Sequence, residues 1–113
     1  GPIGRKQGVA FQIADLEVML HASRMLTYRA AALKDAGAPY QEFKQAAAVA
    51  KLYSTESAVT ATRIATQVFG GYGFMEEYPV ARFYRDAKVL EVGEGTSEVQ
   101  RMLIARGLGL PVE

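Results

Sequence analysis

Hydrophobic positions recur at intervals of three and four residues within four stretches that contain neither glycine nor proline. In residues 9–36 the recurring apolar positions are Ile13, Leu16, Met19, Leu20, Leu26 and Ala30. Residues 40–69 continue the pattern with Ala46, Val49, Ala50, Tyr53, Ala58, Ala61, Ile64, Ala65 and Val68. This spacing is typical of amphipathic helices, and no run alternates apolar and polar residues as a strand does. We therefore predict helices over 9–36, 40–69, 80–92 and 96–106, and no sheet.

The connections between these stretches favour a compact arrangement of helices. Gly37 suits the end of the first helix and Pro39 prevents it from continuing, so residues 35–39 form a short link. A link this short forces the two long helices to run antiparallel. Pro79 suits the first turn of the third helix, and Ser97 with Gln100 has the spacing of a capping box for the fourth. The predicted fold is an all-α, four-helix up-and-down bundle, two long and two shorter helices in one domain over 1–113.

Composition excludes several classes of function. The 113 residues include 13 basic and 12 acidic ones, a net charge of +1, which gives no electrostatic reason to expect nucleic acid or an anionic membrane as a partner. There is no cysteine and only one histidine, His21, which we expect to be a packed or partly exposed helix residue, so no metal site is predicted. No stretch approaches the roughly 20 apolar residues of a membrane span. We expect a soluble cytoplasmic domain.

Two features exceed what a plain bundle needs. Residues 69–74 place three glycines in four positions, which fits either a loop between helices or a cradle for a phosphate or cofactor. The segment lacks the ending of a P-loop and has no strand before it, as a dinucleotide fingerprint requires. Glu94 stands between Gly93 and Gly95 immediately before the last helix. Such a carboxylate either has room for a ligand to approach or serves the helix dipole.

The spacing of these features resembles a known family. Residues 67–86 read Q-x-x-G-G-x-G-F-x-x-E-x-x-x-x-R-x-x-x-D, which is similar to the signature of the C-terminal domain of acyl-CoA dehydrogenases, the flavin enzymes that desaturate acyl thioesters. Residues 94–101 resemble the family's E-G-T-[SN]-x-[IV]-Q-R element, and residues 7–16 resemble its Q-x-x-x-F-x-L-A-D-M helix opening. Family members are considerably longer, with an N-terminal helical domain and a middle β-domain. The resemblance thus implies a C-terminal fragment of such an enzyme.

The resemblance also implies roles for individual residues. Glu94 would be the base that removes the α-proton of an acyl-CoA while a hydride leaves the β-carbon for FAD. Gly93 and Gly95 would lie against the substrate. The implied FAD contacts are Gln7, Gln67, Val68, Phe69, Gly70, Gly71, Thr96, Ser97 and Glu98, with Gln7 and residues 67–71 reaching the flavin of a neighbouring subunit. The product would be the trans-2-enoyl-CoA, electrons would pass to an electron-transferring flavoprotein, and the enzyme would be a homodimer or homotetramer, in the mitochondrial matrix if eukaryotic.

One departure and three alternatives accompany the resemblance. Many family members carry tyrosine where this chain has Gly93, so the acyl-chain preference of a tyrosine-bearing relative does not transfer. The same motifs fit an acyl-CoA oxidase or a flavoenzyme that desaturates an acyl group on a carrier protein. A non-catalytic helical oligomerisation module is the third alternative, which the retained Glu94 disfavours. We expect the aromatic cluster to lie in the core or at a subunit interface; it consists of Tyr72, Phe74, Tyr78, Phe83 and Tyr84.

Overall fold

The computed structural model describes all residues from 1 to 113 and confirms an all-α chain. Its elements are η1 (Ile3–Arg5), α1 (Gln7–Asp35), α2 (Tyr40–Phe69), η2 (Gly70–Phe74), α3 (Val80–Val92) and α4 (Ser97–Gly107), where η denotes a short 3₁₀-helix. Two α-helices are long and two are shorter, as predicted, and there is no strand. No helix is both long enough and apolar enough to cross a membrane.

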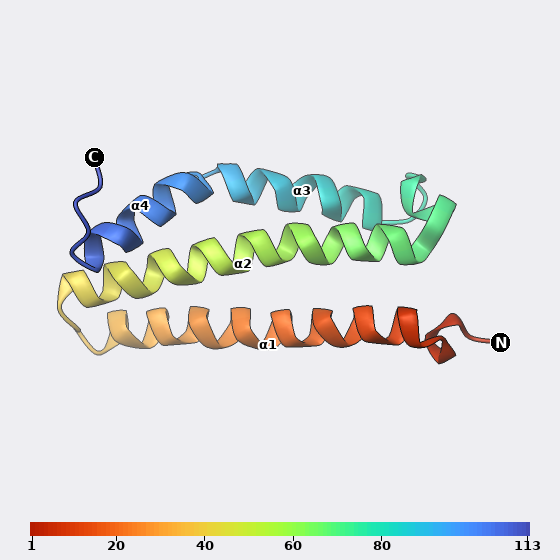
Figure 1. Cartoon of the computed structure of the whole chain (residues 1–113), viewed down its shortest axis with the longest axis horizontal. Helices are drawn as coiled ribbons and strands as arrows, with labels where there is room; N and C mark the ends of the chain where they lie inside the picture. The colour runs from red at the N-terminus through yellow and green to blue at the C-terminus, as the bar shows by residue number, and fades with distance from the viewer.

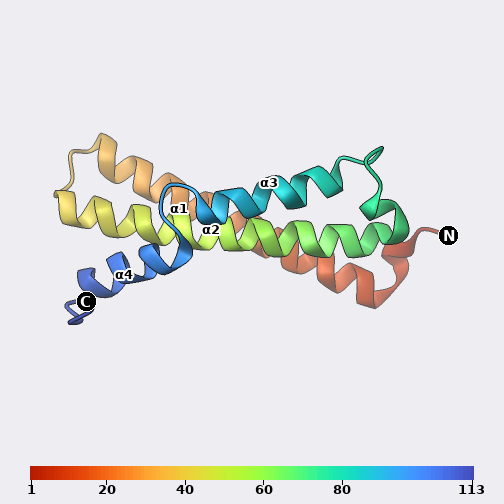
Figure 2. The same cartoon turned by 90° about the horizontal axis from the view of Figure 1, so that it is seen from above.

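The long helix α2 is the centre of the molecule. Helix α1 packs along one side of it, and α3 and α4 pack along the other (Figures 1 and 2). The chain direction alternates between α1, α2 and α3, as predicted for an up-and-down bundle. The fourth helix departs from that prediction: α4 continues in the direction of α3, so the two shorter helices lie end to end against α2. The result is an elongated body of 53 × 25 × 24 Å with its termini at opposite ends (Figure 1).

The antiparallel hairpin of α1 and α2 is closed by the predicted glycine. Gly37 has φ 69°, in the left-handed region that a residue without Cβ adopts at little cost. Its N–H donates to the Lys34 carbonyl at 3.1 Å, and the Ala38 N–H donates to the Leu33 carbonyl at 3.0 Å. These two bonds form a Schellman motif, which satisfies the last carbonyls of α1 and turns the chain toward α2.

Small side chains make the contact between the two long helices. Ala30 of α1 and Ala46 and Ala50 of α2 are buried together, with Leu26 and Leu33 packed against them. Only nine of the 113 residues are buried, because the outer faces of the helices have no covering element within the chain. The five members of the aromatic cluster are therefore all exposed, and the prediction that they form core is wrong; a subunit interface stays a prediction.

The N-terminal caps of the two shorter helices differ from the sequence predictions. Pro79 is the N-cap of α3 and precedes the first turn instead of lying in it. The predicted capping box of Ser97 and Gln100 is wrong. Thr96 is the N-cap of α4, and its hydroxyl accepts a hydrogen bond from the Val99 N–H at 3.2 Å. Ser97 is already helical, and Gln100 reaches Glu94 instead of the cap.

Candidate active site

The turn between α3 and α4 holds its carboxylate in an unusual backbone conformation. Glu94 has φ 58° and is the only residue other than glycine with a positive φ. A side chain in this region crowds the following carbonyl and costs about 1–2 kcal/mol. Gly95 follows with φ 98°, and a Cβ there would lie 2.8 Å from the Gln100 side-chain nitrogen. The glycine at 95 is thus required by its backbone conformation, and a side chain there would also displace the Gln100 amide. Glu94, by contrast, adopts a conformation that its side chain disfavours.

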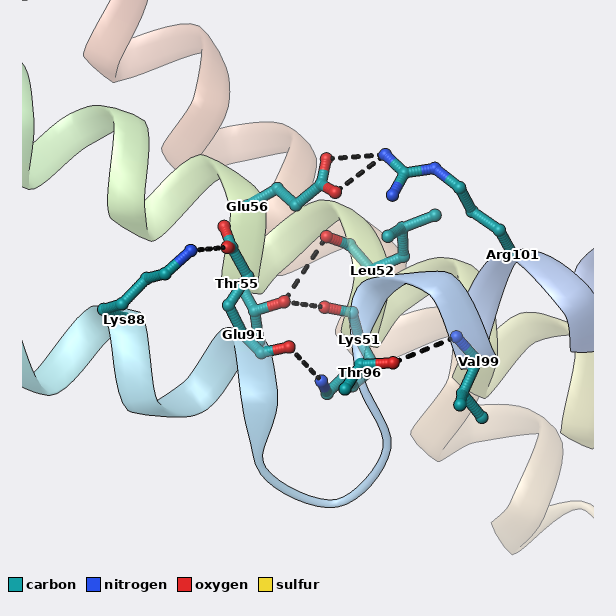
Figure 3. A network of polar contacts seen from close by, with 9 residues as sticks. All are labelled: Lys51, Leu52, Thr55, Glu56, Lys88, Glu91, Thr96, Val99 and Arg101. Carbon is teal, nitrogen blue, oxygen red and sulfur yellow. Dashed lines mark hydrogen bonds and ion pairs between the residues drawn. The ribbon is translucent and has the colours of Figure 1, made fainter.

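Side chains from two helices hold this turn. Lys51 of α2 donates from Nζ to the Gly95 carbonyl at 2.6 Å and to the Glu91 carbonyl at 3.4 Å. The Gln100 amide of α4 donates to the Glu94 carbonyl at 3.4 Å. Figure 3 shows the Lys51 ammonium reaching the Glu91 carbonyl inside the curve of the loop, beside Thr96. These bonds fix the backbone on both sides of Glu94.

Two ion pairs flank the turn. On α3, Lys88 contacts Glu91 at 2.6 Å, and this hydrogen bond and the carboxylate charge raise the pKa of Lys88 above its usual 10.5. The pair is therefore intact at neutral pH and is lost only as the pH rises through that raised pKa. On the other side, Arg101 of α4 contacts both oxygens of Glu56 of α2, at 2.7 and 3.0 Å (Figure 3). The second pair ties α4 to α2 independently of the turn.

The Glu94 carboxylate itself is exposed and has no hydrogen bond or ion pair within the chain. A carboxylate without a partner is available to accept a proton from a ligand. A shallow groove of about 610 Å³ runs along α3 as far as Gly93, the residue before Glu94, and is lined by Tyr84, Arg85, Lys88, Val89, Val92 and Gly93. A Cβ at Gly93 would meet only the Val89 carbonyl, at 3.3 Å. The glycine thus leaves the groove open where a tyrosine would project.

The glycine-rich segment forms a second site at the end of α2. This segment forms the five-residue 3₁₀-helix η2 and borders a pocket of about 630 Å³. The pocket is lined by Arg63, Thr66, Gln67, Gly70, Gly73, Phe74, Glu76, Ala81, Tyr84 and Arg85. Gly70 has φ 66° and so needs to be glycine. Gly73 is buried, and a Cβ there would collide with the Thr66 carbonyl. Gly71 has neither constraint, because a Cβ there would meet nothing within 4 Å.

The structure divides the predicted site residues between two places. Gln7 begins α1 at the same end of the molecule as η2, in both views. Residues 67–71 lie there as well, whereas residues 93–98 lie at the far end of α3. A helix of 13 residues separates the two sites, about 20 Å at 1.5 Å per residue.

Residues 96–98 differ in whether their side chains are free to contact a ligand. Glu98 is exposed in the first turn of α4. The Thr96 hydroxyl accepts the Val99 N–H and keeps its own proton to donate. Ser97 is buried, and its hydroxyl has no hydrogen-bond partner.

Sequence reasoning missed two residues that the structure places at these sites. Lys51 is 44 positions from Gly95, and Arg63 lies one helical turn before Gln67 in the pocket beside η2. The available signal for Lys51 was a single charge directly after Ala46–Ala50, where Ala46, Ala48 and Ala50 are buried. A lysine so close to buried alanines has few ways to keep its ammonium solvated and needs acceptors.

No three histidine, cysteine, aspartate or glutamate side chains gather closely enough to hold a metal ion. The fold and the two sites define a helical domain with one unpaired carboxylate on a strained turn and one glycine turn beside two guanidinium groups.

Comparison with known proteins agrees with this description. The family described as acyl-CoA dehydrogenase, C-terminal domain, matches residues 1–109. The short-chain-specific acyl-CoA dehydrogenase of Clostridium acetobutylicum is 48% identical over 99 residues, 88% of this chain and 25% of that protein. The chain belongs to the acyl-CoA dehydrogenase family, of which it is the C-terminal domain.

Solved structures show the same arrangement of helices. Butyryl-CoA dehydrogenase from Megasphaera elsdenii matches with a TM-score of 0.91 and 44% identity, over 96% of this chain and 27% of that one. The FAD complex of PigA matches with a TM-score of 0.91 and 32% identity, over 97% of this chain and 28% of that one. The chain spans about a quarter of the length of the relatives that it matches.

Proposed function

We propose that this chain works as the C-terminal domain of an FAD-dependent acyl-CoA dehydrogenase, called the whole enzyme below, that converts an acyl-CoA to the trans-2-enoyl-CoA. The whole enzyme adds an N-terminal helical domain and a middle β-domain to residues 1–113. The observation that carries the proposal is Glu94, an exposed, unpaired carboxylate held in a left-handed turn between two glycines. Neither packing nor helix capping needs a strained carboxylate at this position, since Thr96 supplies the cap.

In the proposed reaction Glu94 takes the α-proton of the acyl-CoA onto a carboxylate oxygen. Gly93 and Gly95 let the thioester approach, because neither glycine has a side chain to obstruct it. A bound acyl chain in the groove along α3 displaces water from the turn, and a less hydrated carboxylate is a stronger base. The open groove at Gly93 accommodates a wider or branched acyl group than a tyrosine at this position would.

The residues beside η2 fit the FAD that the proposal requires. Arg63 and Arg85 offer guanidinium donors and Gln67 offers an amide. The Gly70 N–H already donates to the Gln67 carbonyl, whereas the backbone of Gly71 has open space beside it. Such a donor set suits a diphosphate. We assign Gln7 and residues 67–71 to this contact, and Thr96, Ser97 and Glu98 to the flavin side of the base turn. When bound, FAD accepts the hydride that leaves the β-carbon.

The separation of the two sites supports an oligomer. Residues 67–71 lie about 20 Å from the base turn, the length of α3. As the family resemblance implies, the glycine turn of one subunit contacts the flavin of a neighbouring subunit, and Glu94 of the same subunit acts beside a different flavin. We propose a homodimer or homotetramer that passes electrons to an electron-transferring flavoprotein, in the cytoplasm of a bacterium or the mitochondrial matrix of a eukaryote.

Anaerobic mixing of the whole enzyme with acyl-CoA thioesters of increasing length and branching tests the proposal. Bleaching of the oxidised flavin band with at least one thioester is expected, followed by reoxidation that is faster with electron-transferring flavoprotein than with air. Fast reoxidation by air would assign the enzyme to the oxidases. No bleaching with any thioester, while a carrier-protein thioester does bleach the flavin, would assign it to the carrier-linked enzymes.

A further inference from the structure

Lys51 is the one charged side chain that reaches the base turn from a separate helix. Its Nζ lies 2.6 Å from the Gly95 carbonyl and 3.4 Å from the Glu91 carbonyl (Figure 3 shows the second contact). These carbonyls stand one residue after and three residues before Glu94. Because one ammonium binds both carbonyls, it holds the two ends of the loop together and attaches the loop to α2.

The electrostatics of this position favour a cation. The Glu91 carbonyl belongs to the last turn of α3, where the unpaired carbonyls of a helix carry a partial negative charge. Hydrogen bonds from an ammonium are about twice as strong as those between neutral groups. Lys51 is half-buried, so water screens its contacts less than those of a surface lysine.

The strained backbone at Glu94 makes such a fastening necessary. A residue with a side chain keeps a left-handed backbone conformation only where several surrounding contacts hold it there. The other bonds at the turn, from Gln100 and from the Thr96 cap, come from α4 itself and move with it. Only Lys51 fixes the turn relative to the long helix against which the rest of the chain packs.

We propose that Lys51 is a positioning residue for the reaction: it holds the turn so that the Glu94 carboxylate stays where the α-proton of the substrate will lie. This inference rests on the proposed function. Lys51 touches neither substrate nor flavin in this scheme and acts only through the backbone of residues 91–95. A carboxylate displaced by about 1 Å loses of the order of 10²-fold in rate.

A purely structural role would give a different pattern. The pair of Glu56 and Arg101 already ties α2 to α4, so removal of the Lys51 ammonium frees the turn without undocking the helix. Glu56→Gln is therefore the matched control, because it removes a nearby polar contact of α2, the one with α4, while leaving every bond to the turn in place. Lys51→Arg is the conservative variant, since it keeps the charge and the donors.

The test compares these variants in the whole enzyme by rapid mixing with an acyl-CoA that bleaches the wild type. For Lys51→Met we expect the limiting rate of flavin bleaching to fall about 10–100-fold. Its flavin content and its affinity for a non-reducible acyl-CoA analogue should stay within about twofold. The α-deuterium isotope effect should rise, because proton removal becomes more rate-limiting. Lys51→Arg should recover most of the rate, and Glu56→Gln should bleach like the wild type.

A Lys51→Met enzyme that bleaches at the wild-type rate overturns the inference, as does a Glu56→Gln enzyme that is slowed equally. If Lys51→Met loses flavin through misfolding, Lys51→Gln replaces it, because glutamine is polar but lacks the ammonium charge and is one atom shorter than lysine; wild-type bleaching of that variant overturns the inference equally. If the wild type bleaches with no acyl thioester, the proposed function fails first, and the positioning role of Lys51 fails with it.

Discussion

Glycines 70, 71 and 73 stand in one short turn for different reasons. Gly70 needs its left-handed backbone, and Gly73 needs the absence of a Cβ because the Thr66 carbonyl occupies that space. Neither reason applies to Gly71, whose Cβ position is empty. The fold explains two of the glycines, and the third fits the proposed contact with FAD, which needs open space beside the backbone.

This difference predicts the behaviour of two substitutions in the whole enzyme. Gly73→Ala should lower the free energy of unfolding by about 1–3 kcal/mol, because the backbone has to move to admit the methyl group. Gly71→Ala should leave stability within about 0.5 kcal/mol but weaken FAD binding at least about tenfold, equivalent to about 1.4 kcal/mol. Reconstitution of the apoenzyme, followed by flavin fluorescence, measures the second effect. Gly4→Ala, also at an open position, is the control. Unchanged FAD affinity in Gly71→Ala would remove Gly71 from the proposed contact.

At the scale of single elements, the sequence predicted the bounds of a helix best where a proline precedes the helix and a glycine follows it. The expected ranges 40–69 and 80–92 match α2 and α3, since Pro39 and Gly70 bracket the first and Pro79 and Gly93 the second. Helix α1 begins at Gln7, two residues before the predicted start, because a helix tolerates Gly8 in its first turn. The periodicity of apolar residues alone does not define the N-terminal end of α1.

Contacts between distant parts of the chain explain what could not be predicted at the base turn. The motif around Glu94 pointed to the carboxylate, but the lysine that holds the turn is 44 positions away. Thr96 and Ser97 both offer a hydroxyl as the cap, and Thr96 takes this role because its backbone is extended (φ −64°, ψ 167°) whereas Ser97 is already helical. Neither relation appears in local spacing.

The corrected cap of α4 leads to a prediction for the isolated chain. Thr96→Ala should lower the free energy of unfolding by about 0.5–2 kcal/mol, because the Val99 N–H loses its acceptor. Ser97→Ala should stay within about 0.5 kcal/mol of the wild type, since the Ser97 hydroxyl has no partner to lose. Urea unfolding midpoints at constant m value give both numbers. A larger loss for Ser97→Ala than for Thr96→Ala would restore Ser97 as the cap.

At the scale of the whole molecule, the chain has too little core for its apolar content. The outer face of α1 carries Phe11, Val18, Met25 and Tyr28, which are 62–67% exposed. The first three are spaced seven residues apart, so they form one stripe along the helix. Contiguous exposed apolar surface of this kind is typical of a face that another domain or subunit covers.

We therefore predict that residues 1–113 on their own associate with themselves. Sedimentation velocity at tens of micromolar should show dimers or larger species, and replacement of Val18 and Met25 by glutamate should shift the chain toward the monomer. Glutamate at the exposed positions Ala31 and Ala32 of the same helix is the control for added charge. A wild-type chain that sediments as a monomer at this concentration would contradict the prediction.

The most direct measurement concerns Glu94 in the whole enzyme. Glu94→Gln keeps the size of the side chain and removes the base, and the exposed carboxylate has no internal partner to lose. Flavin content and unfolding midpoint should match the wild type, while flavin bleaching by acyl-CoA should slow by at least about 10²–10⁴-fold. Glu17→Gln, which alters an exposed carboxylate on α1, should bleach at the wild-type rate. A Glu94→Gln enzyme that bleaches as fast as the wild type would show that the base lies elsewhere.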